Sequence, residues 1–415
     1  MDSRDWRAWK ELLADVPLPA ALVDLDAMAE NAALLLDRLG PPPVTLRIAT
    51  KSLRCVAIIR RALTLCGARA RGLMTYSARE TAWLAREHGG DGFDDFLLAY
   101  PAARPDEARA LVEAAARPGT RVRAMVDDPA HVALLVEAVA AAGGAVGQGG
   151  GGLTLCIDVD AAWRPVPSKH VHLGVRRSPI RTPEAAVALA DRARDAGLVV
   201  DAVMAYEAQV AGMADDSRGG SWLDPVRRAI RTRSQPVVAA RRRAVVAALA
   251  AAGHRIEVVN GGGTGSVAAT AHDGSVSEVT VGSGFLASHL FDGYRGLPLR
   301  PAAFFALAVD RVPDAGFVTC FGGGYVASGA TGRDRSPIVH APTGWSVTGP
   351  EGWGEVQTPL AMAPGTPPLA IGDPVICRHA KSGEVFERFE ACYLVSHGRL
   401  GDRVRTYRGE GRGFG

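Results

Sequence analysis

The stretch VTLRIATKSLRC, residues 44–55, combines a strand pattern with a lysine. Val44, Leu46 and Ile48 alternate with other residues, which is the period of a β-strand. Lys51 follows directly, and the run CVAIIRRALTLCG, which closes on Gly67, predicts a helix after it. A lysine at the end of an apolar strand is either a solvated strand terminus or a placed chemical group. The rest of the chain bears on this choice.

The same strand-then-helix unit recurs along the chain. Further strand-like runs are GLMTYS (72–77), DDFLLAYP (94–101), RVRAMVDD (121–128), LTLCIDVD (153–160), LVVDAVMAYE (198–207), RIEVVNGGGTG (255–265) and EVTVGSG (278–284). Strands that alternate with helices run parallel, and eight such units predict a closed α/β barrel, the (β/α)₈ or TIM barrel. An open doubly wound sheet is the alternative, but it would need a topological switch point.

After residue 285 the pattern changes. Residues 286–415 contain many Gly and Pro, short apolar runs such as FFALAVDRV and FERFEACYLV, and no clear helical pattern. We therefore expect a barrel over residues 20–285 and a β-rich C-terminal domain over 286–415. Residues 1–19 are expected to pack with the second domain, because they precede the segment that opens the barrel, ALVDLDAMAENAALLLDRLG.

Composition narrows the possible partners. The net charge of +3, from 47 basic and 44 acidic residues, is too even to indicate a nucleic-acid partner. The basic clusters at 227–233 and 241–243 are expected to form the solvent-exposed face of a long helix. No apolar run is long enough to cross a membrane, and from the start MDSRDWRAWK we expect no signal peptide. The six scattered cysteines indicate reduced thiols, so we expect a cytoplasmic protein.

The barrel gives Lys51 a functional position. Barrel enzymes act at the carboxyl ends of their strands, and Lys51 ends the first strand. The glycine-rich stretches NGGGTGS (260–266) and VGSG (281–284) end the seventh and eighth strands. Glycines there let backbone N–H groups approach a phosphate, and Thr264 and Ser266 add hydroxyl donors, although tight turns at a barrel rim also need glycine. A phosphate pocket together with a rim lysine is the outline of a pyridoxal 5'-phosphate site.

Several further pieces, in order, carry a family resemblance. They are the opening LPAALVDLDAMAENAALLLDRLG (18–40), HLGVRRSP (172–179), MAYEAQVAG (204–212) and CRHAKSGE (377–384). With Lys51 and the glycine stretches, they make the chain resemble the alanine-racemase-like, fold-type III pyridoxal-phosphate enzymes from about residue 18 to 400. Within these it is most similar to the D-threonine aldolase and D-serine dehydratase group. The resemblance implies a lyase that acts on a small β-hydroxy-α-amino acid, expected to be of D configuration, and a homodimer.

The resemblance also implies roles for single residues. Lys51 would hold the cofactor covalently and serve as one acid or base. Arg176, or Arg177 if the alignment is shifted by one residue, would lie near the cofactor ring, and Tyr206 would pack against it. Thr280 takes the position facing the pyridine nitrogen, where alanine racemases have an arginine, and this argues against racemisation. The phosphate would be held by Gly262, Gly263, Thr264, Ser283 and Gly284.

The relatives place a divalent metal near the substrate, held by a histidine and by an aspartate or cysteine two residues later. This chain has His379, but Lys381 stands at the second position. In a strand, Cys377, His379 and Lys381 would share one face. Either Lys381 replaces the charge of the metal, or Cys377 supplies a replacement ligand. His379 would take or deliver the proton of the β-hydroxyl group.

Two other functions stay open at this point. A racemase of the same fold would need an acid or base on the opposite face of the cofactor, for which Tyr325 and Tyr393 are the candidates. A non-catalytic pyridoxal-phosphate carrier is the other alternative, but such proteins are typically a single barrel. The sequence does not separate aldol cleavage from dehydration.

Overall fold

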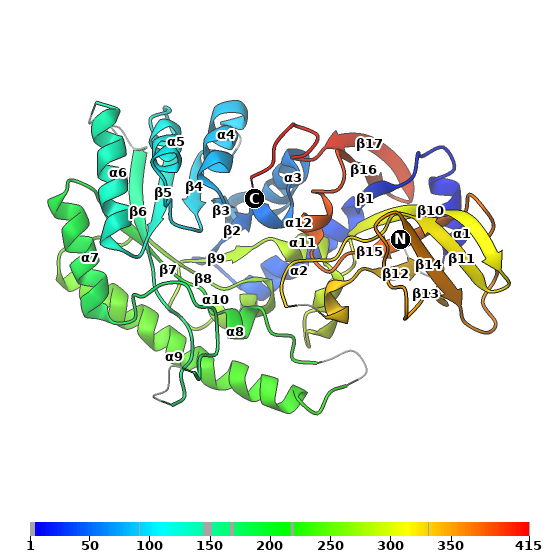
Figure 1. Cartoon of the computed structure of the whole chain (residues 1–415). Coiled ribbons are helices and arrows are strands. Elements are labelled where there is room, and N and C mark those ends of the chain that lie inside the picture. Colours follow the sequence, from blue (N-terminus) through cyan, green and yellow to red (C-terminus); the bar gives the residue numbers. More distant parts are fainter. Residues whose placement is uncertain are drawn as a thin grey trace. The chain divides into compact units, whose positions relative to one another are not determined.

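The computed structural model describes residues 5–90, 92–143, 152–166, 170–216, 220–330 and 332–414. The chain divides into two compact units. The barrel unit comprises Leu35–Lys51, Arg60–Gly282 and Phe414–Gly415, and the sheet unit comprises Met1–Leu34, Ser52–Ile59 and Ser283–Gly413. In Figure 1 the barrel strands carry the labels β2 to β9, and the sheet unit holds β1 and β10 to β17.

The barrel unit contains a closed barrel of strands that follow one another in sequence order. Thr45 at the start of β2 is paired with Glu278 of β9 in parallel, which closes the ring. The predicted (β/α)₈ barrel is therefore confirmed, and each predicted strand overlaps an observed one. The strands are Thr45–Ala49 (β2), Ala70–Thr75 (β3), Asp95–Leu98 (β4), Arg121–Val126 (β5), Gly152–Asp158 (β6), Val200–Ala205 (β7), Val258–Gly261 (β8) and Glu278–Val281 (β9).

Helices alternate with these strands, and several begin with proline. Proline is favoured in the first turn because its missing N–H would be unpaired there anyway. Asp128 and Thr182 cap the helices that start at Pro129 and Pro183, since each side chain accepts an N–H of the first turn. The helices are Leu25–Leu39 (α2), Val56–Cys66 (α3), Ala78–His88 (α4), Pro105–Ala115 (α5), Pro129–Ala141 (α6), Pro183–Asp195 (α7), Ala208–Ala211 (α8), Asp224–Ala251 (α9) and Val267–Ala271 (α10). None of the described helices is long and apolar enough to cross a membrane.

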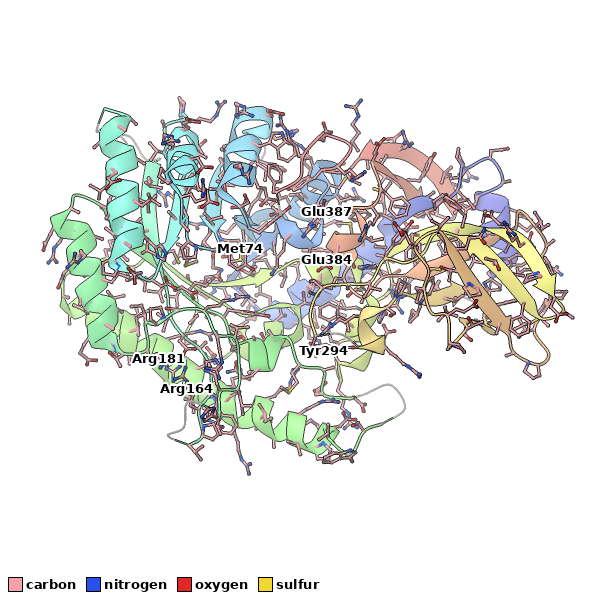
Figure 2. All side chains as sticks on the ribbon, in the orientation of Figure 1. Met74, Arg164, Arg181, Tyr294, Glu384 and Glu387 are labelled. Carbon is pink, nitrogen blue, oxygen red and sulfur yellow. The ribbon has the colours of Figure 1, made fainter. Side chains whose placement is uncertain are left out.

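The barrel core contains an apolar cluster and a charged layer. The cluster includes Met74 on β3, which Figure 2 labels, together with Leu97, Met125, Cys156, Ala202, Met204 and Val258. The charged layer lies nearer the amino ends of the strands. There Arg47 donates to Glu278 (2.6 Å) and Asp95 (2.8 Å), and Arg123 pairs with Asp95 (3.0 Å) and Asp201 (3.0 Å). Both arginine side chains are fully buried, and this burial is tolerated because opposite charges surround them.

The helix α9 corrects one expectation about the basic clusters. The predicted long helix is present and contains residues 227–233 and 241–243. Arg242, however, is only 1% exposed and forms an ion pair with Glu207. The cluster at 241–243 is therefore not wholly a solvent-exposed face. A run of three arginines does not reveal from sequence alone that one of them points inward to a buried carboxylate.

The sheet unit confirms the predicted β-rich domain. Its strands follow the order β13-β14-β11-β10-β1-β16-β17, and β15 pairs with both β10 and β12. The strands are Ala20–Asp24 (β1), Ala303–Asp314 (β10), Phe317–Phe321 (β11), Ile338–Ala341 (β12), Trp345–Val347 (β13), Gln357–Met362 (β14), Pro374–Arg378 (β15), Ala391–Ser396 (β16) and Arg399–Arg405 (β17). The helices of this unit that lie wholly within it are Trp6–Leu12 (α1), Ser283–Leu286 (α11) and Ser382–Val385 (α12).

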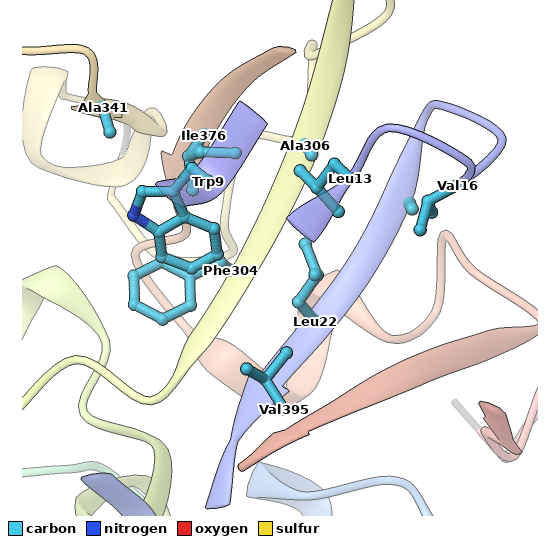
Figure 3. Close-up of a cluster of buried hydrophobic side chains, with 10 residues drawn as sticks. Trp9, Leu13, Val16, Leu22, Phe304, Ala306, Ala341, Ile376 and Val395 are labelled. Carbon is cyan, nitrogen blue, oxygen red and sulfur yellow. The ribbon is translucent and has the colours of Figure 1, made fainter. Parts of the chain in front are cut away.

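The strand β1 differs from the expectation that its segment opens the barrel. Ala21 of β1 is opposite Phe305 of β10 in an antiparallel pair and opposite Cys392 of β16 in a parallel pair. The strand thus lies inside the sheet of the sheet unit, between β10 and β16. Figure 3 shows the buried cluster around it, in which Trp9 of α1 contacts Phe304 edge to face, with ring centres 5.1 Å apart.

Candidate active site

Lys51 lies where β2 passes into the short 3₁₀-helix Thr50–Ser52. The Thr50 hydroxyl donates to the carbonyl oxygen of Met74 (3.1 Å), which ties this turn to the neighbouring strand β3. The side chain of Lys51 is exposed, and its Nζ lies 3.4 Å from Oη of Tyr100. Tyr100 follows β4, so the ends of two barrel strands meet at this lysine. Lys51 has the predicted position at the carboxyl end of the first barrel strand.

Arg177 lies beside two tyrosine rings at this end of the barrel. Its guanidinium carbon is 5.3 Å from the ring centre of Tyr100 and 5.6 Å from that of Tyr206, distances typical of cation–π contacts. The sequence pointed first to Arg176 for a place near the cofactor, with Arg177 as the alternative. The structure brings Arg177 to Tyr206 and Tyr100. Both arginines are exposed, so these ring contacts are what favours Arg177.

The two tyrosines differ in how easily they ionise. Burial and the Glu207 carboxylate raise the pKa of Tyr206 to about 12, so this phenol stays neutral. Burial also opposes ionisation of Tyr100, but the charges of Lys51 and Arg177 outweigh it and lower the pKa of that phenol. Tyr100 is therefore the more acidic of the pair.

A chain of polar contacts fixes the loop that carries Arg177. Asp160 pairs with Arg164 (3.0 Å), which Figure 2 labels, and Nη2 of Arg164 lies 2.8 Å from Nδ1 of His172. Since a guanidinium only donates, Nδ1 of His172 accepts. In the neutral ring, Nε2 then carries the proton, and it lies 2.9 Å from the carbonyl oxygen of Val175. The backbone two residues before Arg177 is held in this way.

Asp158 adds a carboxyl group at the end of β6. It lines a small pocket together with Arg177, Ser178 and Tyr206. Burial and the nearby Asp127 raise the pKa of Asp158 to about 7, while Arg177 acts in the opposite direction. This carboxyl group is therefore partly protonated at neutral pH.

Glu207 holds the glycine-rich loop that follows β8. It directly follows Tyr206, and its Oε2 accepts the N–H of Gly262 (3.1 Å) and pairs with Arg242. Its Oε1 accepts the hydroxyls of Ser266 (3.0 Å) and Thr270. Burial opposes the negative charge, but Arg242 and these donors outweigh it and keep the pKa of Glu207 below its usual value. One buried carboxylate therefore positions the whole loop.

The glycines of this loop serve close packing. Gly262 has a φ of +73°, and a Cβ on it would lie 2.7 Å from Val279. A Cβ on Gly263 would lie 3.0 Å from the Cβ of Ala211. The N–H of Gly262 donates to Glu207, and the N–H of Gly263 donates to Oγ of Ser266 (3.1 Å). Both amide groups that were predicted to bind a phosphate thus already have acceptors in the protein, Glu207 for Gly262 and Ser266 for Gly263.

Thr280 lies on β9 and is buried. Its Oγ1 is 2.8 Å from Nδ2 of Asn260, which also donates to Glu278 (2.7 Å). Because an amide NH₂ only donates, the Thr280 oxygen accepts, and its own proton can be donated to another acceptor. Thr280 is a neutral donor at the position where the resemblance expects the pyridine nitrogen.

Two further predicted residues begin the helix α11 of the sheet unit. Ser283 and Gly284 are its first residues, and Gly284 is buried. The hydroxyl of Ser283 lies 3.0 Å from that of Ser52, either of which can donate. Ser52 is the residue directly after Lys51 in the chain.

His379 and Lys381 follow β15 in the sheet unit. The ring of His379 is buried, its Nδ1 lies 2.9 Å from the amide nitrogen and 2.6 Å from the carbonyl oxygen of Lys381, and burial lowers its pKa. The ammonium of Lys381 donates to Oγ of Ser328 (2.6 Å) and pairs with Glu384 (3.3 Å), the latter labelled in Figure 2. Lys381 is thus held by a hydroxyl and a carboxylate.

Cys377 differs from its expected place beside these two residues. The strand β15 ends at Arg378, so Cys377, His379 and Lys381 do not follow one strand face. Cys377 is fully buried, and burial raises its pKa well above the usual value, which keeps it a thiol. Over the described part of the chain, no three His, Cys, Asp or Glu side chains are grouped to hold a metal ion.

Sequence reasoning missed four residues of this region: Tyr100, Asp158, Glu207 and Arg242. Tyr100 and Asp158 lie near the ends of the strand-like runs DDFLLAYP and LTLCIDVD, at the edge where a barrel places its chemistry. Glu207 lies inside MAYEAQVAG, where a carboxylate directly after an apolar strand was the available signal. Arg242 gave no such signal.

The closed barrel and the separate β-rich sheet define the class of fold. It is the alanine-racemase-like, fold-type III architecture, and the resemblance drawn from the sequence is confirmed at the level of the fold. No model of a known protein family matches the sequence. No curated protein matches it either.

Particular solved structures share this fold over nearly the whole chain. The chain is similar to a D-threonine aldolase from Filomicrobium marinum, with 22% identity, a TM-score of 0.76 and 96% of each chain covered. It is similar to a D-threo-3-hydroxyaspartate dehydratase from Delftia sp. HT23, with 19% identity, a TM-score of 0.69 and coverage of 95% of this chain and 98% of that one. An alanine racemase from Clostridium difficile 630 gives 11% identity, a TM-score of 0.61 and coverage of 94% and 99%.

Proposed function

We propose that the protein is a pyridoxal-phosphate-dependent lyase that acts on β-hydroxy-α-amino acids. The observation that carries the proposal is the group formed by Lys51, Tyr100, Arg177 and Tyr206 at the carboxyl ends of the barrel strands. This is the end at which barrel enzymes act. Two proteins of this fold are, by their names, a D-threonine aldolase and a D-threo-3-hydroxyaspartate dehydratase, and both names describe chemistry on such amino acids.

The residues of the barrel unit fit pyridoxal phosphate by their chemistry. Lys51 supplies an exposed primary amine for the aldehyde, and Arg177 with Tyr206 supplies a cation and a ring face for a flat anionic ligand. Thr264 supplies a hydroxyl in the loop after β8. Ser283 and Gly284 remain predicted phosphate ligands. When bound, the cofactor supplies an electron sink for the charge that develops at Cα of the substrate.

The chain's own residues then have distinct tasks. Lys51 holds the cofactor and moves a proton at its Nζ. Thr280 offers a neutral hydroxyl proton where racemases of this fold type have an arginine, and this favours a lyase over a racemase. Arg177 is held by the loop that Asp160, Arg164 and His172 fix, so its charge has a set place at the barrel rim.

At the β-hydroxyl group we propose His379 as the base. Burial lowers its pKa, so its ring is neutral near pH 7 and able to accept a proton. Lys381 carries the positive charge that assists it, and Ser328 and Glu384 hold that ammonium in place. This charge takes the part that a divalent metal has in the relatives.

The proposal covers two outcomes. In aldol cleavage a base takes the hydroxyl proton and the Cα–Cβ bond breaks, which releases an aldehyde and a smaller amino acid. In dehydration the Cα proton is lost first and the hydroxyl then leaves, which yields ammonia and a 2-oxo acid. We propose D-configured substrates for both.

Borohydride reduction tests the cofactor assignment. Protein incubated with pyridoxal phosphate, reduced and digested should carry the cofactor on the peptide that contains Lys51. Lys51→Ala should lose this label, whereas Lys10→Ala, a change at an exposed lysine that pairs with Asp373, should keep it. Cofactor that stays fixed to the Lys51 variant would show that another residue is the anchor.

A substrate panel tests the reaction class. D- and L-threonine, D- and L-serine and the 3-hydroxyaspartates are incubated with the holoenzyme, with and without chelator, and aldehyde, ammonia and 2-oxo acid are measured. Aldehyde identifies an aldolase, and ammonia with 2-oxo acid identifies a dehydratase. Inversion at Cα without either product would contradict a lyase.

A further inference from the structure

Tyr100 stands beside two positive charges at the carboxyl ends of the barrel strands. Lys51, after β2, has its Nζ 3.4 Å from the phenol oxygen, and Arg177, from the loop after β6, lies 5.3 Å from the ring centre. The other ionisable groups that face it are Asp158 at the end of β6 and Tyr206 after β7. Asp158 opposes a phenolate only when it is ionised, and Tyr206 stays neutral.

We propose that Tyr100 and Lys51 form a proton-sharing pair that makes Lys51 a nucleophile. The phenolate oxygen of Tyr100 takes one proton from the Lys51 ammonium, which gives a neutral phenol and a neutral amine. The phenol of Tyr100 first loses its proton to water. In the sharing step one N–H bond of the ammonium then breaks and one O–H bond of the phenol forms. The pair rests on the proposed function for its use, because a neutral amine is what attacks an aldehyde carbon.

The surroundings of Tyr100 explain why it, and not the neighbouring phenol, is suited to this step. The Lys51 ammonium donates to the phenol oxygen of Tyr100, and its charge favours the phenolate form that can take a proton back from it. Arg177 favours the phenolate form of Tyr100 without donating a proton itself. Tyr206 is half-buried, and its burial together with the charge of Glu207 disfavours its phenolate. Tyr100 is thus the phenol of the two that ionises more easily.

A titration of the cofactor-free protein tests the pair directly. Phenolate absorbance in the near ultraviolet is followed against pH for the wild type and for Tyr100→Phe, and their difference isolates one phenol. The same difference is then measured in the Lys51→Ala background. We expect the Tyr100 phenol to ionise at higher pH once the ammonium is removed. An unchanged titration in Lys51→Ala would overturn the pairing.

The rate of cofactor capture tests its consequence. Cofactor-free protein is mixed with pyridoxal phosphate, and the visible band is followed over time. At neutral pH, Tyr100→Phe should capture the cofactor about 100-fold more slowly, a typical effect of losing a proton-transfer group. The difference should shrink in alkaline solution, where hydroxide can take the proton in place of the phenolate. Tyr294→Phe, directly after the short 3₁₀-helix His289–Gly293 of the sheet unit, is the matched control.

Two outcomes separate this inference from the proposed function. If the wild type never carries reducible cofactor at Lys51, the proposed function fails, while the titration still measures the pair. If Lys51 is labelled but Tyr100→Phe captures the cofactor at the wild-type rate, the inference fails alone. Arg177→Leu, which leaves Tyr100 in place, gives a second probe in the titration of the cofactor-free protein, where the Tyr100 phenol should ionise at higher pH. If neither Tyr100→Phe nor Arg177→Leu differs from the wild type in these measurements, the pair is refuted.

Discussion

Glu207→Gln is expected to destabilise the barrel unit and to loosen the loop after β8. The change keeps the size of the side chain but removes the negative charge that faces Arg242. Both residues are 1% exposed, so water cannot replace the lost partner. The amide oxygen can still accept from Gly262 and Arg242, and its NH₂ can donate to the hydroxyls of Ser266 and Thr270 after these rotate. The main loss is therefore that of charge.

The size of this effect follows from the burial of the ion pair. Removing one partner of a buried pair costs about 3–5 kcal/mol in free energy of unfolding. Because the amide retains several hydrogen bonds, we expect the lower end, about 3 kcal/mol. The direction in which this stabilisation changes with pH follows from the pKa of Glu207, which is lowered in the folded protein. Its contribution is present above the unfolded pKa of 4.5 and is lost as the pH falls through the folded value.

Urea unfolding followed by circular dichroism and tryptophan fluorescence measures this difference. Glu113→Gln, an exposed carboxylate on α5, is the matched control and should unfold as the wild type does. Retention of pyridoxal phosphate should also weaken in Glu207→Gln, by about tenfold for each 1.4 kcal/mol of lost loop ordering. If Glu207→Gln is as stable as Glu113→Gln at neutral pH, the buried Glu207 carboxylate does not stabilise the loop after β8 as described.

Three further outcomes are expected. The pKa of Asp158 rises from 3.8 to about 7 on folding, so the free energy of unfolding of the wild type should fall by up to about 4 kcal/mol as the pH rises from about 4 to about 7. Asp158→Asn should remove this fall in urea titrations. Gly262→Ala places a Cβ 2.7 Å from Val279 at a φ of +73° and should cost about 1–3 kcal/mol in unfolding experiments; an unchanged midpoint would contradict the strain. Wild-type turnover should survive chelation. Lys381→Asp should lose its turnover in chelator and regain part of it with added manganese or zinc. Wild-type activity that depends on metal would contradict the replacement of the metal charge by Lys381.

The fold could be predicted from the sequence wherever the period of apolar residues was informative. The alternation of strand and helix runs identified the barrel, and the change after residue 285 identified the β-rich unit. The segment Ala20–Asp24 was misplaced because all its residues are buried in the sheet. A strand buried on both faces has the same apolar pattern in a barrel as in the middle of a sheet.

The candidate site was predictable where chemistry is local in the chain. Lys51 and the glycine-rich loop can be identified from the sequence, because a lysine and a run of glycines stand out at the ends of predicted strands. The pairing of Lys51 with Tyr100, and of Glu207 with Arg242, joins residues that are far apart in sequence. Nothing in the local pattern specifies which residues meet across a barrel, so these contacts required the structure.

The charged layer inside the barrel has a consequence for how the barrel can be divided. The first four strands, β2 to β5, contribute Arg47, Asp95 and Arg123 to it, whereas β6 to β9 contribute only Asp201 and Glu278. A chain cut after Ala142 would thus give two half-barrels whose inner surfaces carry opposite excess charge. Each half alone would expose charges that lack partners, and the two would attract one another. Their complementation should therefore weaken with rising ionic strength, and swapping the halves of two such barrels should succeed only when the inner charges match.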